Sequence, residues 1–64
     1  MSGPSIQELY QRAAHSRQMA SEFQALADMD IINRDEYLER AASCLADAEE
    51  AELAIKAMRE YAAL

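Results

Sequence analysis

The stretch Asp30-Ile31-Ile32-Asn33 separates two long segments that both have the residue pattern of amphipathic helices. Asn33 is a preferred N-cap residue, and Glu36, three positions later, completes a helix start signal. Ile32, the residue before the cap, is placed to pack against Tyr37 as a hydrophobic staple. The sequence therefore predicts a turn over residues 30–33 that joins two antiparallel helices.

The first segment begins with a capping signal of its own. Ser5 and Glu8 form a Ser-x-x-Glu capping box, after a short lead that holds the chain's single Gly and single Pro. Apolar or small residues then recur at alternating steps of three and four, which is a heptad pattern. We expect a helix over residues 5–29 whose buried stripe consists of Ile6, Leu9, Ala13, Ser16, Ala20, Phe23 and Ala27.

The second segment repeats the heptad spacing over residues 34–62. Two pairs with favourable i,i+4 order, Glu36 with Arg40 and Glu52 with Lys56, are expected to form ion pairs along this helix. Its stripe consists of Tyr37, Ala41, Cys44, Ala48, Ala51, Ile55, Met58 and Ala62. The fold class is therefore all-α, with residues 1–64 forming one helical-hairpin domain.

Two helices touch along one line only, so each leaves part of its apolar stripe in water. A second hairpin would cover the remainder, and we expect a homodimer that forms an antiparallel four-helix bundle. Small stripe residues favour a close approach of the helices, near 8 Å. The residues expected to carry this oligomer interface are Leu9, Ala13, Ala20, Phe23, Leu38, Ala41, Cys44, Leu45, Ala48, Ile55 and Met58.

The charge balance narrows the choice of partners. Six basic residues against twelve acidic ones give a net charge of −6. Because nucleic acids and anionic membranes attract Lys and Arg, direct binding to either is disfavoured. The sequence has no run of eighteen apolar residues and no cationic leader, and its lone Cys44 fits a reducing compartment. We expect a cytoplasmic protein.

One concentrated polar feature lies in the second helix, and it supports two interpretations. It comprises Asp47, Glu49, Glu50 and Glu52. These carboxylates can form a solvated face that keeps a small bundle soluble. Alternatively, they form a partner-binding acidic face that meets a basic protein surface. That alternative is a small acidic inhibitor, of the phage or mobile-element anti-defence or antitoxin type, that blocks the nucleic-acid-binding surface of its target.

Residues 23–40 resemble the short C-terminal (SHOCT) oligomerisation motif. In that motif a Leu-rich helix is followed by a Gly-Ile-Ile/Leu-Thr turn and by Glu-Glu-Phe at the start of a second helix. Ile31, Ile32, Asn33, Glu36 and Tyr37 match its turn and cap, whereas Asp30 stands where the motif has Gly. The resemblance implies self-association rather than chemistry.

In architecture alone, the chain is similar to the repressor-of-primer family of helical hairpins. That family dimerises into a four-helix bundle and binds RNA through a basic, polar face of its first helix. Arg12 and Arg17 are the basic residues that the first helix offers here. RNA binding by a four-helix-bundle regulator is therefore the second alternative, which the charge balance disfavours.

The residues that could support catalysis are better explained by packing or solvation. His15 falls opposite the stripe, where an exposed histidine is ordinary, and Cys44 lies within it as a packing thiol. Neither a Glu-x-x-His nor a His-x-x-x-His pair occurs, so we expect no metal site, no cofactor and no enzyme activity. The sequence indicates a non-catalytic, self-associating interaction or regulatory module.

Overall fold

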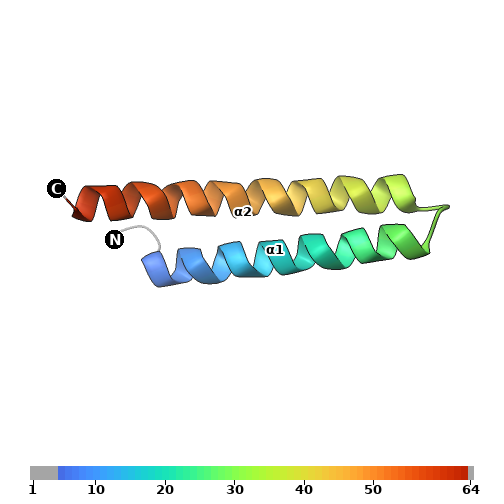
Figure 1. Ribbon diagram of the computed structural model, residues 1–64, viewed down its shortest axis with the longest axis horizontal. Helices are drawn as coiled ribbons and strands as arrows, with labels where there is room; N and C mark the ends of the chain where they lie inside the picture. Colours follow the sequence, from blue (N-terminus) through green and yellow to red (C-terminus); the bar gives the residue numbers. More distant parts are fainter. Residues whose placement is uncertain (1–4, 64) are drawn as a thin grey trace.

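The computed structural model describes residues 5–63 as two helices, α1 (Ile6–Met29) and α2 (Arg34–Ala62), joined by a short turn (Figure 1). The helices run antiparallel and side by side, so that the start of α1 and the end of α2 lie at the same end of the hairpin. The hairpin is 50 Å long and 18 by 16 Å across. The predicted all-α helical hairpin is confirmed.

The start of α1 follows the predicted capping signal. The Oγ of Ser5 accepts a hydrogen bond from the backbone N–H of Glu8, at 3.2 Å. Ser5 itself has an extended backbone conformation, as an N-cap residue does. The helix therefore begins at Ile6, one residue after the predicted start.

Small residues form most of the contact between the helices. The eight buried residues all belong to the predicted stripes, and six of them are alanine: Leu9, Ala13, Ala20, Ala27, Ala41, Ala48, Ala51 and Ile55. Alanine lets the two backbones approach closely but removes little apolar surface from water. Within residues 5–63, the structure fully buries none of the large side chains.

The turn differs from the prediction in the residue that stabilises it. The side chain of Asn33 caps no backbone N–H of α2. Instead, Oδ1 of Asp30 accepts hydrogen bonds from the backbone N–H groups of Ile32 (3.1 Å) and Asn33 (3.2 Å). The amide Nδ2 of Asn33 donates to Oδ2 of Asp30, at 2.9 Å. Asn33 occupies the predicted N-cap position of α2, but because its side chain binds Asp30, the predicted side-chain cap is wrong.

The predicted hydrophobic staple is also absent from the turn. Ile32 is 92% exposed, so it does not pack on Tyr37. The Tyr37 ring stacks instead on Phe23 of α1, with ring centroids 6.4 Å apart and an interplanar angle of 26°. Met29 and Ile31 are also largely exposed. The turn therefore presents apolar side chains to solvent rather than folding them inwards.

Neither α1 nor α2 contains an apolar stretch of the length that crossing a membrane requires.

Candidate interaction surfaces

Two long flanks of the hairpin lie on either side of the line where α1 and α2 meet. Each flank follows the three-and-four spacing of a helix surface. We call them the Arg12 face and the Arg17 face. The Arg12 face comprises Arg12, Ser16, Met19, Phe23 and Leu26 of α1 and Tyr37, Arg40, Cys44, Asp47, Glu50, Ala54, Met58 and Tyr61 of α2. The Arg17 face comprises Tyr10, Ala14, Arg17, Ser21, Gln24 and Asp28 of α1 and Leu38, Ala42, Leu45, Glu49, Glu52, Lys56, Arg59 and Ala63 of α2.

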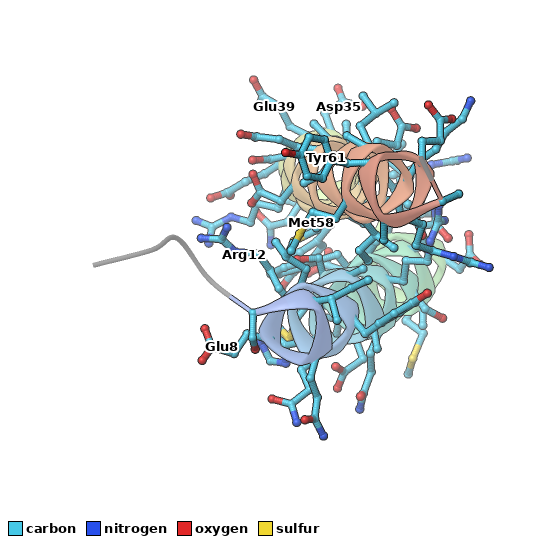
Figure 2. All side chains as sticks on the ribbon, turned by 90° about the vertical axis from the view of Figure 1, so that its left-hand side faces the viewer. Glu8, Arg12, Asp35, Glu39, Met58 and Tyr61 are labelled. Atoms are coloured by element: carbon cyan, nitrogen blue, oxygen red, sulfur yellow. The ribbon has the colours of Figure 1, made fainter. Side chains whose placement is uncertain are left out.

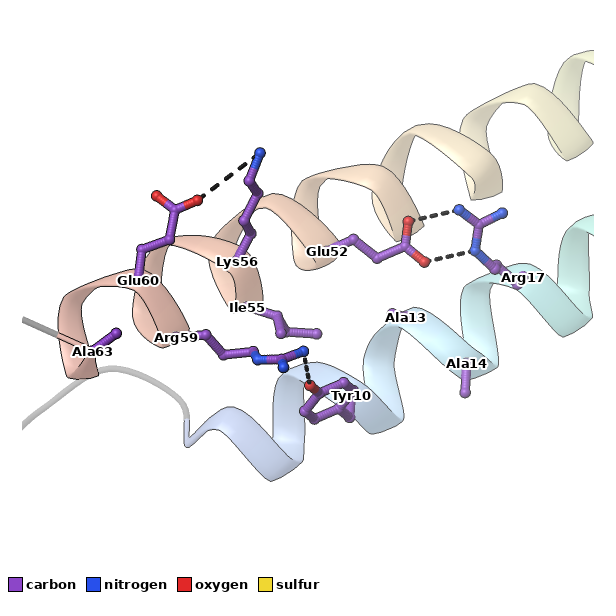
Figure 3. Close-up of a pocket in the computed structure, with 10 residues that line it drawn as sticks. All are labelled: Tyr10, Ala13, Ala14, Arg17, Glu52, Ile55, Lys56, Arg59, Glu60 and Ala63. Atoms are coloured by element: carbon purple, nitrogen blue, oxygen red, sulfur yellow. Dashed lines mark hydrogen bonds and ion pairs between the residues drawn. The ribbon is translucent and has the colours of Figure 1, made fainter.

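The Arg17 face contains an ion pair between the two helices (Figure 3). Nε of Arg17 donates to Oε2 of Glu52 at 2.7 Å, and Nη2 donates to Oε1 at 2.6 Å. This geometry is the bidentate arrangement that guanidinium and carboxylate groups favour. The hydrogen bond and the charge of Glu52 raise the pKa of Arg17, and the hydrogen bond from Arg17 lowers the pKa of Glu52.

A groove runs along the Arg17 face from this ion pair to the open end of the hairpin (Figure 3). It has a volume of about 690 Å³, and apolar atoms of Ala13, Ala14 and Ile55 form part of its wall. Nη1 of Arg59 donates to the Tyr10 hydroxyl at 3.4 Å, and Nζ of Lys56 lies 3.9 Å from Oε1 of Glu60. The wall of this groove is mostly apolar, and these charged groups lie around its rim.

The Arg12 face has a smaller hollow, of about 340 Å³. Arg12 and Ser16 line it from α1, and Asp47, Glu50 and Ala54 line it from α2, with Leu9 and Ala51 also contributing. Figure 2, a view along the hairpin, shows Arg12 and Met58 on the same flank. Towards the turn, the Phe23–Tyr37 stack and Leu26 continue this face as an apolar surface.

The residues predicted for the oligomer interface divide into two groups. Leu9, Ala13, Ala20, Ala41, Ala48 and Ile55 are buried between α1 and α2 of one chain. Phe23, Cys44 and Leu45 are half-buried, and Leu38 and Met58 are exposed. The second group lies on the flanks, where a further chain has access to it.

The predicted acidic face is divided between the two flanks. Asp47 and Glu50 line the hollow on the Arg12 face, whereas Glu52 and Glu49 lie on the Arg17 face. Glu52 binds Arg17 across the hairpin, so its predicted pair with Lys56 is wrong; Lys56 lies close to Glu60 instead. The predicted pair of Glu36 with Arg40 is confirmed, at 2.9 Å.

Arg17 is the residue of the ion pair that sequence reasoning overlooked. Its position beside the stripe residue Ala13, one helical turn earlier, was a signal that its side chain could reach α2. His15 is exposed, as expected, and Cys44 is half-buried. Arg40, one turn before Cys44, directs its guanidinium to Glu36.

The contacts described on these surfaces are apolar packing contacts, hydrogen bonds and ion pairs. Among residues 5–63, no three His, Cys, Asp or Glu side chains gather in an arrangement that could hold a metal ion. No family model matches the chain, and no curated protein or solved structure shows significant similarity to it.

Proposed function

We propose that the protein is a non-catalytic, self-associating interaction module, in which a second copy completes an antiparallel four-helix bundle. The observation that carries this proposal is that the buried apolar residues are mostly small, whereas larger ones are exposed. Alanines form most of the hairpin's own core, whereas Leu26, Leu38 and Met58 remain between 40% and 42% exposed on its flanks. A second hairpin that docks on one flank would remove the larger side chains of that flank from water.

The dimensions of the hairpin support a partner of its own size. Its radius of gyration is 14.7 Å. A compact domain of this length has a radius of about 11 Å, and one of twice this length about 14 Å. Two hairpins packed along their length would therefore be close in size to a compact domain of their combined length.

The accessible surface of the hairpin also supports this proposal. The hairpin exposes 5192 Å². A compact monomer of 7.2 kDa exposes about 4,100 Å², which leaves an excess of roughly 1,100 Å². A standard protein–protein interface buries about 800 Å² on each partner. The excess is therefore enough for one stable interface between two copies.

Absolute mass measured by light scattering over a dilution series tests the proposal. We expect about 14 kDa, which is twice the chain mass of 7.2 kDa, with a shift towards the monomer only at high dilution. A constant mass of 7.2 kDa at all concentrations would contradict self-association.

The acidic-inhibitor function remains a second proposal because α2 carries eight acidic and four basic residues. Asp47, Glu49 and Glu50 are exposed, and Figure 2 shows Asp35 and Glu39 directed away from α1. The test is competition with duplex DNA for a basic DNA-binding protein. Charge reversal of Asp47, Glu49 and Glu50 should abolish competition; unchanged competition would contradict this proposal. RNA binding has less support, since Glu52 already binds Arg17.

A further inference from the structure

We propose that the second copy docks on the Arg12 face with both turns at the same end of the bundle. Arg12 of each copy then lies against Asp47 and Glu50 of the other. The inference rests on the self-association proposed above and assigns its face and its direction.

The apolar content of the two flanks favours the Arg12 face. The Phe23–Tyr37 stack, Leu26 and Met58 provide partly exposed apolar side chains near both ends of this flank. Half-buried Cys44 lies between them along α2. The charges of this face are Arg40, which is paired with Glu36, and the group around the small hollow, which a second copy would have to pair.

The Arg17 face is less suited to burial. The Arg17–Glu52 ion pair occupies its middle, and Lys56 and Arg59 line the groove beside it. Covering this face would desolvate a pair that is already satisfied within one chain, together with two further cations. The cost of that desolvation makes this flank the outer surface of the dimer.

The charges of the small hollow on the Arg12 face are complementary between two copies. The cation, Arg12, belongs to α1, and the anions, Asp47 and Glu50, belong to α2. None of these three residues takes part in an ion pair among residues 5–63. A partner that places its α2 against α1 would supply each charge with an opposite one.

This complementarity decides the direction of docking. If the two-fold axis runs along the bundle, α1 of one copy meets α2 of the other at the same height, and Arg12 faces Asp47 and Glu50. If the two-fold axis is instead perpendicular to the bundle, α2 of one copy meets α2 of the other. Residues 47–50 lie near the middle of Arg34–Ala62, so the perpendicular axis would bring the acidic residues of both copies together. Like charges in contact disfavour that arrangement.

The face is tested with two leucines of matched exposure. Leu26, on the Arg12 face, is 42% exposed, and Leu38, on the Arg17 face, is 41% exposed. We expect Leu26→Glu to raise the dimer Kd by about 100-fold or more and Leu38→Glu to leave it nearly unchanged. The reverse result would overturn the assigned face but preserve self-association. A wild-type monomer would instead overturn the proposed function.

The direction is tested by charge exchange in low salt. Arg12→Glu and the double variant Asp47→Lys/Glu50→Lys should each weaken the homodimer, by about tenfold. Mixing the two variants should restore dimerisation as a heterodimer, which native mass spectrometry identifies by mass. Lys56→Glu makes the same charge change as Arg12→Glu on the opposite flank and should have little effect.

Each outcome of the exchange is decisive once helicity by circular dichroism shows that the variants are folded. If both variant homodimers are weaker than the wild-type dimer and mixing restores dimerisation, the same-end arrangement is supported, because the perpendicular arrangement sets like charges opposite one another in wild type and in each variant alike. Homodimers that are insensitive to both charge changes would overturn the direction, whether or not the mixed species is preferred, while leaving the Leu26 result to decide the face.

Discussion

Arg17 and Glu52, thirty-five positions apart in the chain, join α1 to α2 through two hydrogen bonds of 2.7 and 2.6 Å. Both side chains remain partly accessible, at 51% and 42%. The pair lies on one flank of a contact that otherwise consists mostly of alanines. It therefore helps to fix the orientation and the register of α1 against α2, which the small alanine side chains constrain only weakly.

Replacing Glu52 by Gln should lower the urea midpoint of unfolding, because the charged acceptor of Arg17 is lost. Since solvent screens an accessible ion pair, the loss should be smaller than that caused by a charge at a buried alanine. In 1 M salt, wild type and variant should converge. A difference that grows with added salt would contradict an electrostatic origin.

Acid should destabilise the hairpin through two carboxylates. The hydrogen bond from Arg17 lowers the pKa of Glu52, and hydrogen bonds from the side chain and backbone of Asn33 lower the pKa of Asp30. In the unfolded chain these carboxyls take up protons at higher pH. Their contribution to stability is therefore present at neutral pH and is lost as pH falls below about 4.5.

Urea midpoints measured between pH 7 and pH 3 check this expectation. Glu52→Gln should show a shallower decline than wild type, since one of the two shifted carboxyls is gone. Equal slopes for the two proteins would exclude Glu52 as a source of the pH dependence.

Ala48→Glu should unfold the hairpin, because Ala48 is fully buried between the helices. An unpartnered carboxylate at this position should cost at least about 3 kcal/mol. Ala57, an exposed alanine in the same helix, provides the matched control. Ala57→Glu should change the free energy of unfolding by no more than about 0.5 kcal/mol. Equal helicity of both variants by circular dichroism would contradict the observed packing.

Asp30→Ala should destabilise the turn more than Asn33→Ala. Asp30 accepts hydrogen bonds from two backbone N–H groups and from the Asn33 side chain, whereas Asn33→Ala removes only the last of these. Amide hydrogen exchange at Ile32 and Asn33 should accelerate in the Asp30 variant. Faster exchange in Asn33→Ala than in Asp30→Ala would reverse the assigned roles.

Sequence reasoning predicted the hairpin and all of its buried residues because helical periodicity is a property of each segment alone. Ala20 and Ala48 fall on the buried faces whatever lies opposite them. The local capping rules were less reliable at the turn. Asp30 and Asn33 are both good capping residues, and the turn conformation decides which of them binds the backbone.

The ion pairs mark the second limit of sequence reasoning. The i,i+4 rule correctly predicted the ion pair between Glu36 and Arg40, because both residues lie on a flank of α2 where they are free to pair. It failed for Glu52, since Arg17 of the neighbouring helix offers a bidentate partner. The same limit applies to the acidic cluster, whose members α2 directs to two flanks. Placing them requires knowing how α1 packs.

Thermal unfolding followed by circular dichroism over about a 100-fold dilution tests most directly whether the hairpin depends on a second copy. Because dimerisation couples folding to concentration, we predict that Tm falls as the protein is diluted. A Tm independent of concentration, with full helicity retained, would show that the alanine-rich contact between α1 and α2 suffices for folding. That result would contradict the central role assigned to self-association.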